Sequence, residues 1–159
     1  MSAVFLKLTT GNGKNWIKGA ASVKGHEGWF GVQSFTWQLT VPVDPNTGLV
    51  TGRRQHHALE VVFDGAGSGP AIGSVVLTNA TADAQIDVMG ARAAAGKLAG
   101  GAKIVSVIKL AGVHVQSLVL QADGVNALPA HRMQLVYKSI AWTATDVSTS
   151  SLNDSWVLV

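Results

Sequence analysis

The sequence contains no cysteine among its 159 residues and few charged side chains. Without cysteine the chain can form no disulfide bond, no thiolate zinc site and no cysteine nucleophile. Charged residues make up only 13% of the chain, which is about half the usual share. Mixed charge normally keeps the surface of a monomer soluble. We therefore expect part of this surface to be covered by partner molecules.

Long apolar runs are also missing from the sequence. No segment approaches the roughly 18 consecutive apolar residues of a membrane-spanning helix, so we expect no membrane insertion. The first residues, M-S-A-V-F-L-K-L-T-T, contain one short apolar patch rather than the apolar core of a signal peptide. We expect assembly in the cytoplasm without a cleaved signal peptide. The length favours a single domain, residues 1–159.

The basic residues are scattered, and the net charge is only +3. Arg53 and Arg54 form the one adjacent basic pair. A nucleic-acid surface normally needs more clustered lysine and arginine together with exposed aromatic side chains. The sequence therefore predicts no nucleic-acid binding.

Carboxylates and histidines form no recognisable active site. The only glutamates are Glu27 and Glu60, and glycosidase chemistry needs two carboxylates placed together. His56 and His57 are neighbours, and neighbouring side chains in a strand point to opposite faces. They cannot chelate one metal ion, and the other histidines are isolated. We predict no catalytic residue and no metal site.

The glycine-rich segment G-A-G-S-G, residues 65–69, fits neither of two motifs that it resembles. A dinucleotide fingerprint needs a third glycine where Pro70 stands. A nucleophile elbow around Ser68 needs glycine at positions 66 and 70, which are alanine and proline. We predict no nucleotide or other cofactor.

The clearest structural signal is an alternating pattern over residues 29–41, W-F-G-V-Q-S-F-T-W-Q-L-T-V. This pattern predicts one long strand with an apolar and a hydrophilic face. The residues expected on the first face are Trp29, Gln33, Phe35, Trp37, Leu39 and Val41. Pro42 ends the strand, and a long loop over about residues 42–56 contains the turn-forming D-P-N-T-G. The next strand is predicted over residues 57–64.

The remaining segments predict more strands and a single short helix. Residues 71–80 read as a helix after Pro70, with Ile72, Val75 and Val76 on one stripe. Residues 103–121 predict a long strand with a bulge or bend at Gly112, and another bend is expected near 138–139. Further strands are expected at about 4–8, 16–22, 85–91, 133–142 and 155–159, with a loop over 93–102. About eight short strands and one helix favour a barrel or a sandwich.

The order of motifs resembles the haemolysin-coregulated protein family, the tube protein of type VI secretion systems. A long strand carries Ser34-Phe35-Thr36-Trp37, the long loop closes with T-G-R-R-Q-H at 51–56, and Ile140-Ala141-Trp142-Thr143 lies near the C-terminus. The resemblance covers about residues 16–145. The sequence departs from the family in a small, neutral stretch over 64–70 and in an Ala/Gly-rich segment over 91–102.

The resemblance implies a fold and an assembly. The expected fold is mainly β: a single β-barrel of about eight strands with one flanking short α-helix, similar to phage tail-tube proteins. Six copies would form a ring, and rings would stack into a tube that a contractile sheath drives out of the cell. The expected partners are further copies of the chain, sheath, spike and baseplate proteins, and effector proteins in the lumen. The family implies no enzyme activity and no cofactor.

The family's extended loop reaches onto neighbouring subunits, and it corresponds here to about residues 42–56. The resemblance therefore implies a subunit contact formed by Asp44, Asn46, Gly48, Thr51, Gly52, Arg53, Arg54, Gln55 and His56. Two alternatives remain open at this point: the tube protein of a related phage-tail-like contractile particle, and a standalone β-sandwich that binds sugar or protein.

Replacing both Arg53 and Arg54 with alanine is predicted to weaken ring formation or stacking, because the two side chains offer hydrogen-bond donors to an adjacent subunit. The barrel should stay folded, because the loop lies outside the core. Light scattering and negative-stain microscopy measure the assembly, and rings of unchanged stability would contradict the loop assignment.

Overall fold

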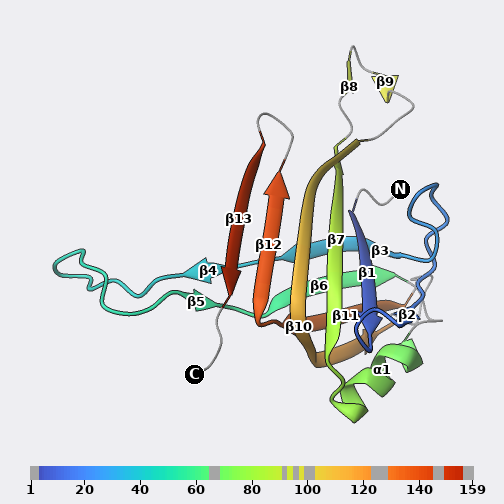
Figure 1. Cartoon of the computed structure of the whole chain (residues 1–159), viewed down its shortest axis with the longest axis horizontal. Helices are drawn as coiled ribbons and strands as arrows, with labels where there is room; N and C mark the ends of the chain where they lie inside the picture. The colour runs from blue at the N-terminus through green and yellow to red at the C-terminus, as the bar shows by residue number, and fades with distance from the viewer. Residues whose placement is uncertain are drawn as a thin grey trace.

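The computed structural model describes residues 4–64, 69–90, 93–94, 97–98, 103–122, 129–144 and 149–155. Six antiparallel strands close into a barrel in the order β11-β6-β3-β1-β7-β10, and β10 pairs with β11 to complete it (Figure 1). These strands are β1 (Val4–Thr10), β3 (Phe30–Thr36), β6 (Leu59–Asp64), β7 (Ala82–Gly90), β10 (Lys103–Gln121) and β11 (Ala130–Val136). The mainly β prediction is confirmed by this closed sheet.

Other strands extend this barrel or stand apart from it. Beyond β10 the sheet continues through β12 (Ser139–Ala144) to β13 (Ser150–Ser155), and β2 (Asn15–Ile17) pairs with one end of β1. Two short hairpins are β4 (Leu39–Thr40) with β5 (Gln55–His56), and β8 (Ala93–Ala94) with β9 (Lys97–Leu98). The predicted barrel of about eight strands is therefore corrected to six strands with additions. Strands of two or three residues leave no alternating pattern for the sequence to reveal.

Strand β10 closes the barrel because it changes partner halfway along. Its first part pairs with β7 and β12, and from His114 onward it pairs with β11. The change occurs at Gly112, whose φ is +64° and where the pairing register shifts. The backbone N–H of Lys138 donates to the carbonyl of Ala111 and holds the corner between β11 and β12 against it. The predicted bend at Gly112 is confirmed, and so is the second bend at 138–139.

The barrel interior and the helix form one apolar core. Helix α1 (Gly69–Thr78) buries Ile72 and Val75, and Val76 packs partly against the same cluster. The predicted helical stripe is therefore confirmed. The barrel contributes the largest fully buried side chains: Phe30, Phe63, Leu6, Leu8, Leu59, Ile86, Leu110, Met133, Leu135, Val61 and Val113.

The helix ends at a defined C-terminal cap. Asn79 takes a φ of +51°, its N–H donates to the carbonyl of Val76, and Ala80 donates to Val75. This pair of bonds satisfies the last free carbonyl groups of the helix. Ser68, which precedes the helix, lies outside the described residues.

The predicted strand 29–41 is interrupted twice. A bulge near Gln33 shifts the register between β3 and β6, so Phe30 and Val32 are buried before it and Gln33 is exposed. The prediction that Gln33 shares the apolar face is wrong, because one extra residue moves the side chains that follow to the other face. Beyond the bulge, Phe35 and Trp37 pack against the core, as predicted. The strand then breaks at residues 37–38.

Several predicted boundaries shift in the structure. The strand expected over 57–64 begins only at Leu59 as β6, and β5 lies just before it at Gln55–His56. The loop expected over 93–102 contains the β8–β9 hairpin. The last strand among the described residues is β13 at 150–155. The strand expected over 155–159 lies almost wholly outside the described part. No helix among the described residues is long and apolar enough to cross a membrane.

Replacing Gly112 with alanine is predicted to lower the free energy of unfolding by about 1–3 kcal/mol, because φ is positive there. A Cβ would also lie only 2.9 Å from the Cβ of Lys138. Urea unfolding followed by fluorescence measures the change. The matched control is Gly73→Ala in α1, where a Cβ meets nothing within 4 Å. The free energy of unfolding of that variant should rise by about 0.5–1 kcal/mol. Equal changes in the unfolding free energy at both glycines would contradict the role of Gly112 in the corner between the two halves of β10.

Candidate functional site

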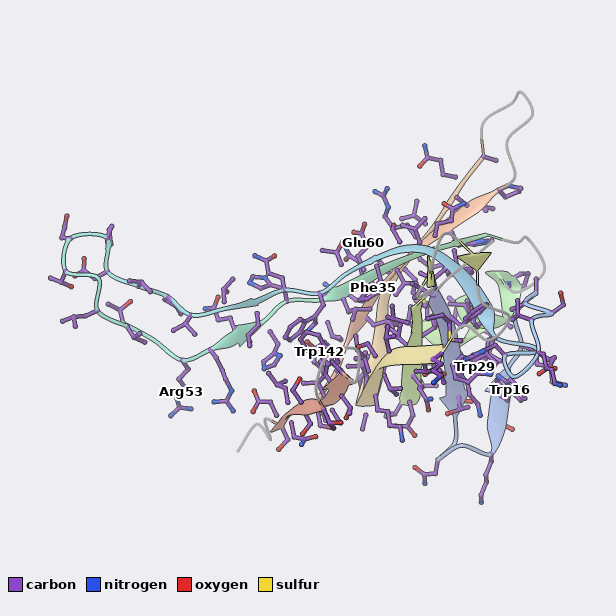
Figure 2. All side chains as sticks on the ribbon, turned by 90° about the horizontal axis from the view of Figure 1, so that it is seen from above. Trp16, Trp29, Phe35, Arg53, Glu60 and Trp142 are labelled. Atoms are coloured by element: carbon purple, nitrogen blue, oxygen red, sulfur yellow. The ribbon has the colours of Figure 1, made fainter. Side chains whose placement is uncertain are left out.

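A long β-ribbon, residues 38–57, projects from one side of the barrel (Figures 1 and 2). We call this ribbon the arm. Its strands are joined by the β4–β5 pairing, by the backbone bond from Thr51 N–H to the Pro42 carbonyl, and by a bridge between Val43 and Val50. The predicted loop over 42–56 is thus a hairpin that the body of the protein does not cover.

The tip of the arm is built by three of the predicted contact residues. The Asp44 carboxylate accepts a bond of 2.8 Å from the N–H of Asn46, and the Asp44 carbonyl accepts one of 2.8 Å from the N–H of Gly48. Gly48 has a φ of +69°, which side chains with a Cβ rarely adopt. Asp44, Asn46 and Gly48 therefore shape the turn itself.

One face of the arm is apolar and uncovered. Side chains alternate along a strand, so Leu39, Val41 and Val43 share the face on which Phe35 and Trp37 reach the core. Val50 lies opposite Val43 and joins them. The exposed fractions of the outer four side chains are large: Leu39 36%, Val41 42%, Val43 50% and Val50 66%. An apolar stripe thus begins in the barrel core and continues outward, where the described part of the chain covers it progressively less.

The return strand of the arm contains a local irregularity that places the two arginines. Thr51 pairs with Pro42 and Gln55 with Thr40, so three residues, 52–54, stand opposite Val41 alone. Gly52 lies against the ring of Pro42, where a Cβ would come within 3.2 Å of its Cγ. A residue with a Cβ at position 52 would therefore crowd this ring.

Arg53 and Arg54 point in different directions. Arg53 extends from the arm away from the body (Figure 2), and its side chain has no hydrogen bond or ion pair within the described part of the chain. Arg54 turns back to the body, where its Nε and Nη2 donate to the two carboxylate oxygens of Asp154 on β13. The two adjacent arginines are therefore not equivalent.

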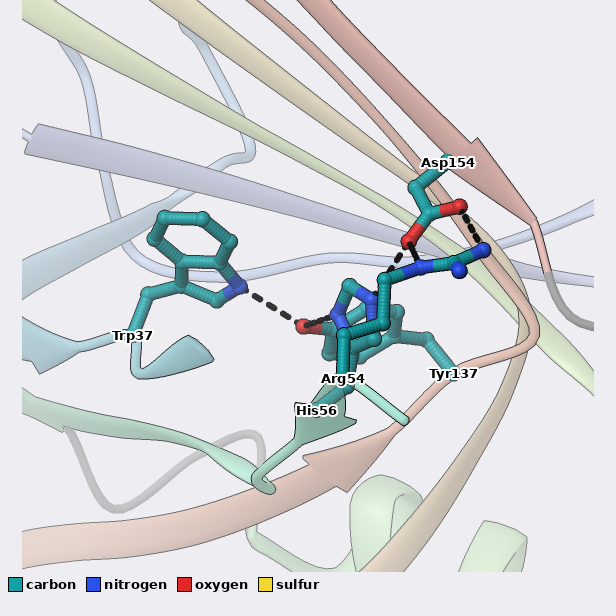
Figure 3. A network of polar contacts seen from close by, with 5 residues as sticks. All are labelled: Trp37, Arg54, His56, Tyr137 and Asp154. Carbon is teal, nitrogen blue, oxygen red and sulfur yellow. Dashed lines mark hydrogen bonds and ion pairs between the residues drawn. The ribbon is translucent and has the colours of Figure 1, made fainter. Parts of the chain in front are cut away.

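Arg54 belongs to a chain of polar contacts at the base of the arm, which we call the root network (Figure 3). His56 Nε2 lies 2.8 Å from Asp154 Oδ2, and His56 Nδ1 lies 3.2 Å from the hydroxyl of Tyr137. The indole N–H of Trp37 donates to the same hydroxyl at 2.7 Å. The network connects both strands of the arm, the corner between β11 and β12, and β13.

The donors and acceptors of the root network match when His56 is neutral with its proton on Nε2. The Trp37 indole can only donate, so the Tyr137 oxygen accepts from it and its O–H points to His56 Nδ1. The Nε2–H of His56 then donates to the Asp154 carboxylate. His57, the neighbour of His56, instead lies 2.8 Å from the Thr40 hydroxyl on the other face of the arm.

The electrostatics of the network follow from these contacts. The hydrogen bond from Arg54, and after it the bond from His56, hold the pKa of Asp154 well below its usual range. The same carboxylate raises the pKa of Arg54. Burial raises the pKa of the Tyr137 hydroxyl, although the bond from Trp37 acts in the opposite direction.

The order carboxylate, imidazole, hydroxyl is that of a hydrolase triad, but the environment here favours a structural role. Tyr137 is only 5% exposed, its hydroxyl is held by Trp37, and its raised pKa makes it a weaker nucleophile at neutral pH. Within the described ranges, no three side chains of the metal-binding types gather in one place.

The sequence located the arm and its residues but not their partner. Asp154 lies 100 residues from Arg54 along the chain, just before the strand that the sequence predicted at 155–159. A single aspartate in the segment S-S-L-N-D-S carries no pattern that marks it. Thr51 and Gln55, also predicted for the contact, are exposed on the arm.

A second buried polar pair fastens residues 18–29 to the outer face of the sheet. His26 Nε2 lies 2.9 Å from Asp87 Oδ2, and Gln85 donates to the other carboxylate oxygen at 3.0 Å. The His26 ring stacks on Phe5 with centroids 4.6 Å apart. These contacts hold the segment against the sheet.

Comparisons with known proteins agree on one family. The family model described as "Type VI secretion system effector, Hcp" matches residues 5–144. No curated protein matches the chain in sequence. A doubly substituted Hcp1 protein from E. coli EAEC 042 superposes with a TM-score of 0.83 and 26% identity, over 99% of this chain and 100% of that one.

Two other solved structures share the fold at lower identity. A protein described as Hcp has a TM-score of 0.83 and 19% identity, over 96% of this chain and 98% of its own. The secreted Hcp3 protein from Pseudomonas aeruginosa has a TM-score of 0.73 and 18% identity, over 97% of this chain and 99% of its own.

Replacing Asp154 with asparagine is predicted to reduce stability at neutral pH but to matter less in acid. The folded protein lowers the pKa of Asp154, so the contribution of this carboxylate is complete above the ordinary carboxyl pKa of about 4 and is lost as the pH falls below it. Urea unfolding of the wild type and the variant, from pH 7 to about pH 2, measures the difference. Asp83→Asn is the control, because Asp83 has no ion pair among the described residues. If the difference in unfolding free energy between the wild type and Asp154→Asn stays constant with pH, the stabilising role of the ionised Asp154 carboxylate is contradicted.

Proposed function

Because the chain belongs to the haemolysin-coregulated protein (Hcp) family of type VI secretion proteins, whose members are structural tube proteins, we propose that it is the repeating subunit of the inner tube. Six copies close into a ring, and rings stack head to tail. The subunit assembles in the cytoplasm and is exported with the tube when the surrounding sheath contracts. Further partners are the spike and baseplate proteins and effectors carried in the lumen.

The uncovered apolar face of the arm is the observation that supports this proposal most directly. A two-stranded ribbon alone is at best marginally stable in water, yet this arm exposes Leu39, Val41, Val43 and Val50 together. Contiguous exposed apolar side chains mark a surface that another molecule covers. The arm reaches too far from its own barrel to be covered by it, so a neighbouring subunit is the natural cover.

We infer a head-to-tail contact between subunits. The arm is on one side of the barrel (Figure 1), which allows it to lie on one neighbour while the body receives the arm of another. Such head-to-tail contacts generate rings or filaments, whereas a self-complementary contact would stop at a dimer. Of the predicted contact residues, the exposed ones, Arg53 among them, are proposed to meet the neighbour. Arg54 and His56 instead bond to Asp154 of their own chain.

The outer face of β1, β7, β10 and β12 has the character that a lumen requires. Lys7, Gln85 and Lys109 lie in register across three strands, and small residues such as Ala111 and Ser139 follow in the next row. This face forms an open groove of about 790 Å³. A polar surface with small side chains lets exported proteins pass without tight apolar binding. We propose that this face lines the lumen.

The alternative of a standalone β-sandwich module fits less well. The sheet closes on itself through the β10–β11 pairing, and a sandwich does not.

Light scattering with negative-stain microscopy tests the proposal: rings with six-fold symmetry are expected. Uniform monomers at high protein concentration would overturn the proposed assembly.

Replacing Val43 and Val50 together with serine is predicted to weaken each subunit contact by at least about 3 kcal/mol, or roughly 100-fold, because a buried valine contributes about 1.5–3 kcal/mol. Light scattering over a concentration series measures the loss of rings, and circular dichroism checks that the barrel stays folded. The matched control is Thr40→Ser, which also removes a branched side chain from the arm but on its polar face and keeps the hydroxyl near His57. Equal assembly of the control and the double variant would contradict the role of the apolar face.

A further inference from the structure

We propose that Asp154 is a positioning residue that sets the direction in which the arm leaves the barrel, and that ring assembly depends on this direction. The proposal rests on the proposed function only in its second half. Its first half concerns the free subunit and can be tested without any assembly.

The arm has a hinge line at its root. The outgoing strand is interrupted at Trp37 and Gln38, between β3 and β4, and the return strand is interrupted at His57 and Ala58, between β5 and β6. The two interruptions face each other, because the N–H of His57 donates to the carbonyl of Gln38 at 3.1 Å. A ribbon whose two strands leave the regular ladder at the same level can pivot there.

The length of the arm makes the angle at this hinge important. The nine residues from Leu39 to Thr47 span roughly 27 Å at about 3.3 Å per residue, so a tilt of about 10° moves the tip by roughly 5 Å. Apolar contacts require heavy atoms within about 4–4.5 Å of each other. A modest change of angle would therefore remove the tip from any surface that it is shaped to meet.

The root network crosses the hinge line and joins the arm to the body. Arg54 and His56 are on the arm side of the hinge, while Asp154 and Tyr137 are on the body side (Figure 3). Asp154 receives both arm side chains: Oδ2 faces Arg54 Nε and His56 Nε2, and Oδ1 accepts from Arg54 Nη2. Two attachment points on one carboxylate define a direction, which a single contact would not.

Asp154 is itself held in a fixed place. β13 pairs with β12 along its whole length, and Asp154 stands opposite Ile140, a core residue that is 2% exposed. Its side chain is 18% exposed and that of His56 only 4%, so the contact between them is largely shielded from water. The two parallel hydrogen bonds from Arg54 to the Asp154 carboxylate add a second constraint. Paired bonds of this kind are strong and also fix the relative orientation of the two groups.

Electron–electron distance measurements between two spin labels test the first half of the proposal. The chain has no cysteine, so the substitutions Thr47→Cys at the arm tip and Ser74→Cys on the exposed side of α1 place labels without further changes. The labelled chains also carry Val43→Ser and Val50→Ser, which are predicted to keep them monomeric. A single narrow distance distribution is expected for the intact network.

Asp154→Ala should widen that distance distribution by about 5 Å or more, because a tilt of about 10° at the hinge moves the tip of the arm by roughly that distance. Arg54→Ala, which changes only an exposed arm residue and cannot disturb the core, should widen it as well. Ser151→Ala on the same strand is the control, because its side chain points to the opposite face of β13. Narrow distributions for both Asp154→Ala and Arg54→Ala would overturn the positioning role.

The second half of the proposal, that ring assembly depends on the direction of the arm, is tested by measuring the assembly of chains that retain Val43 and Val50. If the arm keeps the right direction only about a tenth of the time, the apparent affinity of each contact falls about tenfold. Asp154→Ala should therefore form rings only at a correspondingly higher concentration, with cooperative thermal unfolding retained. Rings of wild-type stability despite widened distances would overturn the link to assembly. A wild type that forms no rings would overturn the proposed function, while the distance experiment would still decide the role of Asp154.

Discussion

The pairing of β10 with two different sets of neighbours is the constraint on which the rest of the structure depends. Its first half belongs to the sheet that continues to β12 and β13, and its second half closes the barrel against β11. Only glycine readily takes the backbone conformation at residue 112 that joins the two halves. Because the same corner receives Lys138 and the adjoining Tyr137, it also sets the body side of the root network.

Closure of the barrel explains why the arm stands free. β3 and β6 pair inside the closed sheet, and their chains run on beyond it as β4 and β5. Phe35 and Trp37 share the apolar face with Leu39 and Val41, but the core that covers the first two ends where the barrel ends. The uncovered half of this stripe is a consequence of strand length, because the two strands run on beyond the barrel.

The sequence predicted those features that repeat locally and missed those that depend on distant partners. The alternation from Phe35 outward, the helical stripe of Ile72 and Val75 and the bend at Gly112 each follow from neighbouring residues. The bulge at Gln33 does not, because a bulge is defined by the register against β6. Asp154 could not be identified either, since its role comes from residues about 100 positions away. The family resemblance located the arm, but it gave no information on which side chains hold its root.

The two arginines of the arm illustrate how a small irregularity can separate an intrachain contact from a side chain that is free for the proposed contact with a neighbour. Neighbours in a strand already point to opposite faces, and the three residues 52–54 opposite Val41 add local freedom to turn. Arg54 uses this freedom to reach Asp154, whereas Arg53 extends away from the body. A variant that changes both arginines therefore alters the direction of the arm and its outer contact at once. Single changes at Arg53 and at Arg54 separate these two effects, because only Arg54 touches the body of its own chain.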